Sequence, residues 1–167
     1  MYSLAALRTG DYSKAAKWYG LAAKRGDAHA QSVLGFMYSA GQGLPQNYSE
    51  AARWYSLAAN QGKYEAQFFL GLAYARGQGV SQSYTIAYMW LSLAAAKAQA
   101  FAKDRDAVAA LLTTRQLAEA QKLASEWSPK KASTGRRKFR PLSGQVHAAS
   151  GLPEKVQRKG LAMVSLK

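Results

Sequence analysis

Apolar residues recur every three to four positions through most of this chain, which is the spacing of an amphipathic helix. Ala30, Leu34 and Tyr38, for example, lie four apart and would share one helix face. The same spacing returns in the next stretch of sequence. The pattern predicts one helix over about 27–40 and a second over about 48–61.

Glycine and proline mark the ends of both helices. Residues 41–45 read Gly-Gln-Gly-Leu-Pro and should stop the first helix, because glycine supplies positive φ and proline cannot continue a helix. Gly62 should end the second helix. Alanine is very frequent while valine and isoleucine are scarce, and this composition also favours helix over sheet.

The helix pair belongs to an internal repeat of 36 residues. Segments 12–47 and 48–83 share 19 of 36 residues when they are aligned at this offset. A third copy begins at Tyr84 and then diverges within the segment 84–127; the shared residues it keeps are Ala87, Trp90, Leu93, Ala94 and Ala95. Such a repeat predicts stacked supersecondary units that bury a continuous core.

Residues that the units share are expected to pack between helices. A glycine inside a helix costs about 1 kcal/mol relative to alanine. Its recurrence at Gly35 and Gly71 therefore indicates close contact with a neighbouring helix. The tryptophans recur at the same 36-residue spacing, which favours a packing role over a cofactor site. The expected packing set is Trp18, Leu34, Gly35, Tyr38, Trp54, Leu70, Gly71, Tyr74 and Trp90.

Three motifs in these units are similar to those of the Sel1-like repeat family, which is related to the tetratricopeptide repeats. Ala-x-x-x-Leu-Gly-x-x-Tyr occupies 30–38 and 66–74. Gly-x-Gly followed by Leu or Val occupies 41–44 and 77–80. Tyr-Ser-x-Ala-Ala-x-Trp-Tyr-x-x-Ala-Ala occupies 48–59. The resemblance covers about residues 1–127.

This resemblance implies a fold and a broad role. The fold would be all-α, a right-handed α-solenoid of antiparallel helix pairs. The role would be that of a non-catalytic scaffold or adaptor that binds another protein, as in bacterial signalling, envelope regulation or host contact. No cofactor is implied.

The divergent unit is expected to close the solenoid. Residues 99–107 contain no Leu-Gly-x-x-Tyr, and the last unit of a solenoid must cover its neighbour while it faces water. The segment 104–112 and the segment that starts at Thr113 look like a capping helix pair. Thr113 and Gln116 have the spacing of a capping box.

Side chains that differ between the units are the better candidates for binding. On the helix over 27–40 and its repeat, they lie nearly opposite the shared face and comprise His29, Ser32, Phe36, Glu65, Phe68, Leu72 and Arg76. Aromatic and aliphatic side chains beside charges suit a partner's helix or extended peptide in a concave groove. The alternative is that these side chains pack against neighbouring helices, and both interpretations stay open.

No motif predicts catalysis, a cofactor or a metal site. The chain has no cysteine, which excludes disulfides, thiolate metal sites and a cysteine nucleophile. Its two histidines, His29 and His147, lie in different regions. The Gly-x-Gly stretch lacks the third glycine and the preceding strand of a nucleotide-binding loop. We therefore expect a protein that is not an enzyme.

The net charge of +14 is concentrated at the C-terminal end. Residues 128–167 hold ten lysines or arginines and one acid, Glu154. The helical periodicity stops at 127, so we expect this segment to be a disordered tail. Such a tail would bind nucleic acid or an anionic membrane surface. This is the alternative to the protein scaffold, and a solvated tail with no specific role is a further one.

No apolar run approaches the roughly 18 residues that a membrane span needs. The N-terminal residues do not resemble a signal peptide, so the chain as given is expected to be cytoplasmic. Residues 2–9 resemble the second half of the helix predicted over 27–40. A gene that starts further upstream, with a signal peptide, would instead place the protein in the periplasm or outside the cell.

Overall fold

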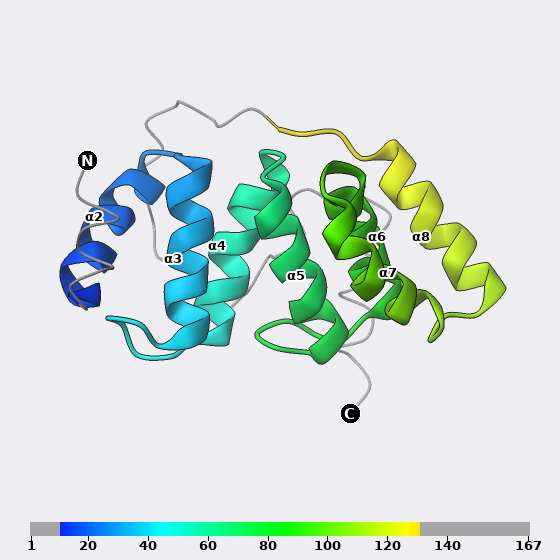
Figure 1. Ribbon diagram of the computed structural model, residues 1–167, viewed down its shortest axis with the longest axis horizontal. Coiled ribbons are helices and arrows are strands. Elements are labelled where there is room, and N and C mark those ends of the chain that lie inside the picture. The colour runs from blue at the N-terminus through cyan, green and yellow to red at the C-terminus, as the bar shows by residue number, and fades with distance from the viewer. Residues whose placement is uncertain (1–10, 131–167) are drawn as a thin grey trace, which may run out of the picture.

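The computed structural model describes residues 11–130, and that part of the chain contains helices and no strands (Figure 1). Its helices follow the 36-residue period, since α4 and α6 begin 36 and 72 residues after α2. The elements in chain order are α2 (Tyr12–Lys24), α3 (Ala28–Ala40), α4 (Tyr48–Asn60), α5 (Tyr64–Arg76), α6 (Tyr84–Lys97), the 3₁₀ turn η1 (Gln99–Phe101), α7 (Ala102–Ala109) and α8 (Thr114–Glu126).

The helices stack side by side in the order of the chain, so that the described part is elongated (Figure 1). Each helix from α2 to α6 packs on the next one in sequence, with the most extensive contacts between α3 and α4 and between α5 and α6. Both α7 and α8 pack on α6. This all-α solenoid is the fold class that the repeat predicts.

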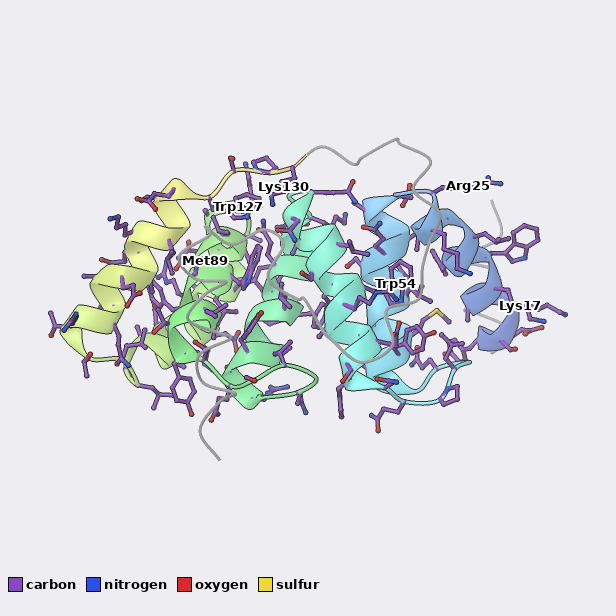
Figure 2. The ribbon with its side chains drawn as sticks, turned by 180° about the vertical axis from the view of Figure 1, so that it is seen from behind. Lys17, Arg25, Trp54, Met89, Trp127 and Lys130 are labelled. Carbon is purple, nitrogen blue, oxygen red and sulfur yellow. The ribbon has the colours of Figure 1, made fainter. Side chains whose placement is uncertain are left out.

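The two tryptophans inside the stack are buried, and the first one is not. Trp54 is 4% exposed and Trp90 is fully buried, and Trp54 lies within the stack in Figure 2. Trp18, which the sequence places in the same packing set, is 58% exposed. The difference follows from its position, because α2 has a described helix on one side only.

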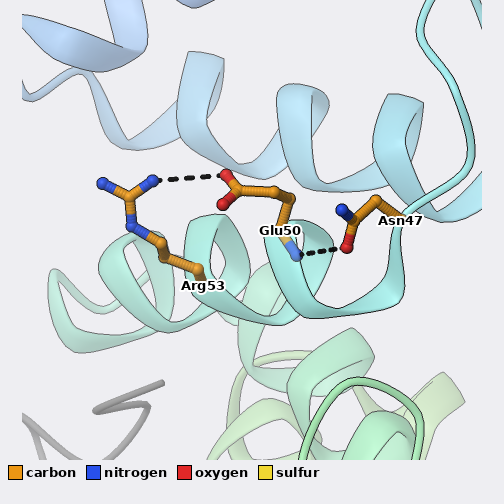
Figure 3. A network of polar contacts seen from close by, with 3 residues as sticks. All are labelled: Asn47, Glu50 and Arg53. Carbon is orange, nitrogen blue, oxygen red and sulfur yellow. Dashed lines mark hydrogen bonds and ion pairs between the residues drawn. The ribbon is translucent and has the colours of Figure 1, made fainter. Parts of the chain in front are cut away.

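Polar side chains cap the helix N-termini, as the turn-rich sequence between the helices suggests. Asn47 precedes α4 and accepts the backbone N–H of Glu50 at 3.0 Å (Figure 3). Glu50 in turn binds Arg53 one turn later, with 3.2 Å between Oε2 and Nη1. Asp11, Asp27, Ser83 and Thr113 cap α2, α3, α6 and α8 in the same way. These caps satisfy N–H groups that have no partner within the helix.

The recurring helical glycines lie where two helices approach most closely. A Cβ atom on Gly35 would lie 2.8 Å from the ring of Tyr55 in the following helix. One on Gly71 would lie 2.7 Å from Cγ of Leu91. Both distances are shorter than any ordinary carbon–carbon contact. The close helix–helix contact expected from the recurrence is therefore present in both units.

The second glycine of each Gly-x-Gly stretch has a packing role that the sequence did not reveal. Gly79 has a φ of +74°, and a Cβ atom there would collide with the carbonyl oxygen of Tyr48. One repeat earlier, a Cβ atom on Gly43 would collide with the carbonyl oxygen of Tyr12 in the same way. The loop after α3 thus rests on the start of α2, and the loop after α5 rests on the start of α4.

The third unit ends in the expected helix pair and continues further than expected. Thr113 and Gln116 form a capping box at the start of α8. Past α8 the chain runs back across the ends of the helices towards α4 (Figures 1 and 2). There the backbone N–H of Lys130 donates to the carbonyl oxygen of Asn60 at 2.7 Å. The ordered fold therefore extends beyond the boundary at 127.

Two expectations fall on residues outside the described range. The proposed disordered basic tail is almost entirely within 131–167, and the suggestion of an upstream start concerns residues before 11. Among the described helices, none is both long and apolar enough to span a bilayer.

Candidate protein-binding groove

Two hollows lie on either side of an aromatic pair formed by Phe36 of α3 and Phe69 of α5. The first hollow has a volume of about 240 Å³ and the second about 290 Å³. Both rings line both hollows, so the two form one groove between α3 and α5. The remaining residues of the first hollow are Ser39, Tyr48, Ala51, Ala52, Tyr55, Leu72, Ala73, Arg76 and Gln78. Those of the second are His29, Ser32, Val33, Met37, Gln42, Lys63 and Glu65.

Stacking fixes the aromatic pair in place. The ring centroids of Phe36 and Phe69 lie 6.2 Å apart, and Phe36 remains 42% exposed. Tyr55 of α4 stacks on the other side of Phe69, with centroids 5.2 Å apart and ring planes at 19°. Tyr55 is itself in contact range of Gly35, which leaves room for its ring beside α3. The ring of Phe69 is therefore packed against other aromatic rings, while that of Phe36 stays partly accessible.

The hydroxyl of Tyr55 is buried beneath the groove. It lies 3.3 Å from Oγ of Ser39, and either oxygen can donate. Burial raises the pKa of Tyr55 to about 12, since the phenolate would lose its hydration. Tyr55 is therefore neutral at physiological pH and contributes a hydrogen bond, not a charge.

The groove carries different charges at its two ends. At one end Nζ of Lys63 pairs with Oε1 of Glu65 at 3.3 Å. At the other end lies Arg76, an exposed residue in the last turn of α5. The middle is lined by aromatic and aliphatic side chains. Such a surface suits a chain with apolar anchors and a polar or acidic end.

The repeat itself is matched by a known family. A sequence model of the Sel1 repeat matches residues 1–27, 28–63 and 65–98, which together make up more than half of the chain. The chain belongs to the Sel1 repeat family. Its second and third matched Sel1 repeats correspond to the helix pairs α3–α4 and α5–α6. The groove therefore lies between the first helices of two successive Sel1 repeats.

Two solved structures with similar sequences are similar in fold to part of this chain. One is a protective antigen of uropathogenic Escherichia coli with an SLR fold; it is 33% identical with a TM-score of 0.67 over 68% of this chain and 25% of that chain. The other is a Sel1 repeat protein from Oxalobacter formigenes; it is 32% identical with a TM-score of 0.53 over 57% of this chain and 38% of that chain. This chain thus spans only part of either protein. No curated protein matches it.

The structure brings six of the seven candidate binding residues to the groove. His29, Ser32, Phe36 and Glu65 line the second hollow, and Phe36, Leu72 and Arg76 line the first. Their exposure differs, because Ser32 is buried against the stack while His29 and Arg76 face solvent. Six of the candidates thus line the groove, and their role in binding a partner stays a prediction.

Phe68 is the candidate that does not belong to the groove. It lines neither hollow, and its ring stacks on Phe101 of η1 with centroids 4.3 Å apart. The physical reason is the divergence of the segment 84–127 from the repeat. In this segment the short η1 turn brings Phe101 onto the face of α5 that carries Phe68. The corresponding residue of α3 is Ser32. Phe68 thus packs against η1 outside the groove, and its role in binding a partner stays a prediction.

Sequence reasoning missed Phe69, which is central to the groove. One signal was available, because Phe69 corresponds to Val33 in the preceding unit and both positions are apolar. Both also line the second hollow. The contribution of Tyr48 and Tyr55 had no such signal, since they come from a helix that the sequence assigns to packing.

The described residues contain no group of three or more His, Asp or Glu side chains that could hold a metal ion. The one carboxylate that lines the groove, Glu65, pairs with Lys63. The side chains of the groove can make apolar and polar contacts with a bound chain.

Proposed function

We propose that this Sel1 repeat protein is a non-catalytic scaffold whose α3–α5 groove binds a helix or an extended peptide of another protein. Members of the family are in general protein-interaction scaffolds, and this chain has their repeat. The finer proposal, the groove, rests on the partly exposed ring of Phe36 between two hollows.

The size of the hollows supports a peptide or helix as the occupant. Each hollow has room for one or two side chains, and Phe36 and Phe69 separate them. A helix presents anchors at i, i+3 or i+4 and i+7, and an extended peptide presents alternate side chains. Either spacing would place one anchor on each side of the aromatic pair. Arg76 would then bind an acidic group at one end.

A peptide library displayed on phage would test the groove without a known partner. Peptides would be selected on the full chain and their affinities measured for the parent, Phe36→Ala and Leu111→Ala. We expect Phe36→Ala to weaken binding at least tenfold, because aromatic anchors dominate binding energy. Leu111 is also exposed but lies outside the groove, so Leu111→Ala should bind as the parent does.

The variant Phe36→Asp provides the test that can contradict the proposed groove. The substitution places a charged side chain at a position that is already 42% exposed, so the fold should stay intact, which thermal melts would verify. If selected peptides bind Phe36→Asp as tightly as the parent, the groove is not the binding surface.

A further inference from the structure

The second hollow of the groove combines apolar walls with one carboxylate. Its volume is about 290 Å³, and its larger apolar side chains are those of Val33, Phe36, Met37 and Phe69. Glu65, in the first turn of α5, lines the same hollow. The corresponding residue of the preceding unit is His29, so the carboxylate does not belong to the residues that the units share. An occupant of this hollow must therefore offer a large apolar body and a group that suits a carboxylate.

The carboxylate of Glu65 has hydrogen-bonding capacity that the described residues do not use. Oε1 lies 3.3 Å from Nζ of Lys63, and Oε2 is buried with no hydrogen-bond partner in the described part of the chain. A carboxylate has about four sites that accept hydrogen bonds. The side chain is 36% exposed and the last torsion of a glutamate is soft, so a donor in the hollow can reach the carboxylate. A bound donor would also satisfy an oxygen whose burial is otherwise unfavourable.

Tryptophan matches this combination better than any other side chain. Its indole has a large apolar surface, and its N–H donates a hydrogen bond and accepts none. Phenylalanine, leucine or methionine would fill the hollow but bring no donor to the carboxylate. Lysine or arginine would bring a second cation beside Lys63. Tyrosine supplies a donor on a smaller ring system, and it is the alternative that an experiment has to separate from tryptophan.

We propose that the second hollow binds a tryptophan side chain of the partner protein, whose indole N–H donates to the carboxylate of Glu65. This inference rests on the proposed function of the groove and adds the chemistry of its occupant. Arg76 then sets how the partner lies. It follows Glu65 by about eleven positions on α5, which is about 16 Å along the helix axis. An extended segment covers that distance in about five residues, so an acidic residue that far from the tryptophan would reach Arg76.

Amides of single amino acids are simple probes of this hollow. N-acetyltryptophanamide, its 1-methyl derivative and N-acetyltyrosinamide would be titrated into the full chain; the 1-methyl derivative lacks the indole N–H. The methyl NMR signal of Met37 reports on the hollow, and that of Met89, which is buried in another cluster, serves as the reference. We expect N-acetyltryptophanamide to shift the Met37 signal and to bind at least fivefold more tightly than the other two amides.

Variants of the carboxylate separate the hydrogen bond from simple filling of the hollow. Glu65→Ala should reduce the preference for the indole N–H to less than about twofold, and Glu65→Gln, which keeps a neutral acceptor, should retain part of it. Arg76→Ala is the matched control, because Arg76 lines only the first hollow and its loss should leave the binding of N-acetyltryptophanamide unchanged. Equal binding of the tryptophan and 1-methyl amides would overturn the proposal. Tighter binding of the tyrosine amide, or no shift of the Met37 signal, would overturn it too.

The groove and its occupant can fail separately. Among peptides selected on the full chain, we expect a tryptophan whose replacement by 1-methyltryptophan weakens binding to the parent at least fivefold, but hardly affects binding to Glu65→Ala. Selected peptides that depend on Phe36 but contain no tryptophan would overturn the tryptophan proposal and leave the groove in place. Peptides that bind Phe36→Asp as tightly as the parent would instead overturn the groove.

Discussion

Gly71 shows how a missing side chain sets the distance between two helices. Leu91 of α6 is fully buried and lies against the backbone of α5 at this residue. A methyl group at Gly71 would lie within 3.2 Å of the carbonyl oxygen of Ala87 as well. Since Leu91 has no free space to move into, the cost of glycine in a helix is offset by packing.

Replacing Gly71 with alanine should therefore destabilise the protein, although alanine is the better helix former. Overpacking typically costs about 1–3 kcal/mol, which exceeds the roughly 1 kcal/mol gained in helix propensity. Gly20 in α2 is the control, because a Cβ atom there would meet nothing within 4 Å. Gly20→Ala should raise the free energy of unfolding measured in urea, and Gly71→Ala should lower it. A stabilised Gly71→Ala would disprove the close contact.

Tyr55 and Tyr74 link single residues to the pH dependence of stability. Burial raises the pKa of both hydroxyls to about 12, whereas tyrosine in an unfolded chain titrates near 10. A pKa that is higher in the folded state means that the folded protein holds its proton longer. The corresponding stability is complete below about pH 10 and is lost as the pH rises towards 12.

We therefore expect the free energy of unfolding to fall between about pH 10 and pH 12, as measured in urea at several pH values. Tyr74→Phe removes one of the two hydroxyls, so its stability should fall less steeply over the same interval. Lysines titrate in this range too, but they affect the parent and the variant alike. Parallel curves for parent and variant would contradict the assignment.

At the scale of elements, the segment after α8 connects the end of the stack to its middle. Trp127 packs edge-to-face on Trp90, with centroids 6.0 Å apart. Pro129 lies over Gly62, and Lys130 donates to the last turn of α4. The carbonyl of Asn60 thereby gains a partner that the helix itself does not supply.

A chain that ends after Trp127 should melt at a lower temperature than one that ends after Lys130. One hydrogen bond to a helix end is worth about 0.5–1.5 kcal/mol, which corresponds to a few degrees for a domain of this size. The chain ending after Lys130 should match the full protein in a thermal melt followed by circular dichroism. Equal melting temperatures for the two shortened chains would show that the segment adds no stability.

Recurring glutamines join successive helices through side-chain hydrogen bonds. Nε2 of Gln31 donates to the carbonyl oxygen of Ala23 at 3.1 Å, and Gln67 does the same with Ala59 at 3.2 Å. The first bond joins α3 to the last turn of α2, and the second joins α5 to the last turn of α4. Glutamine is common on helix surfaces, so its recurrence alone did not indicate burial.

At the scale of the whole molecule, the Sel1 repeats form a stack in which position along the axis decides exposure. Trp18 and Trp54 have the same local sequence, Ala-Ala-x-Trp-Tyr, yet only Trp54 has described helices on both sides. The same local sequence thus contributes a core residue at one place and a surface residue at another. The proposed groove arises where this stacking leaves the aromatic ring of Phe36 partly accessible.

The sequence by itself determined the helices, their ends, the 36-residue period, the family and the close contact at Gly35 and Gly71. These features depend on residues near one another in the chain, or on a comparison of the chain with itself. Helical spacing and glycine chemistry act locally, so they can be recognised without knowledge of the neighbours.

Only the tertiary structure decided which aromatic residues face a groove. Phe68 and Phe69 are adjacent in sequence and both apolar, and the difference between them is made by Phe101 and Tyr55, which stack on them from other elements. The contact of Lys130 with α4 likewise joins segments 70 residues apart. Side-chain exposure is a property of what lies opposite a residue, and a one-dimensional pattern does not contain that information.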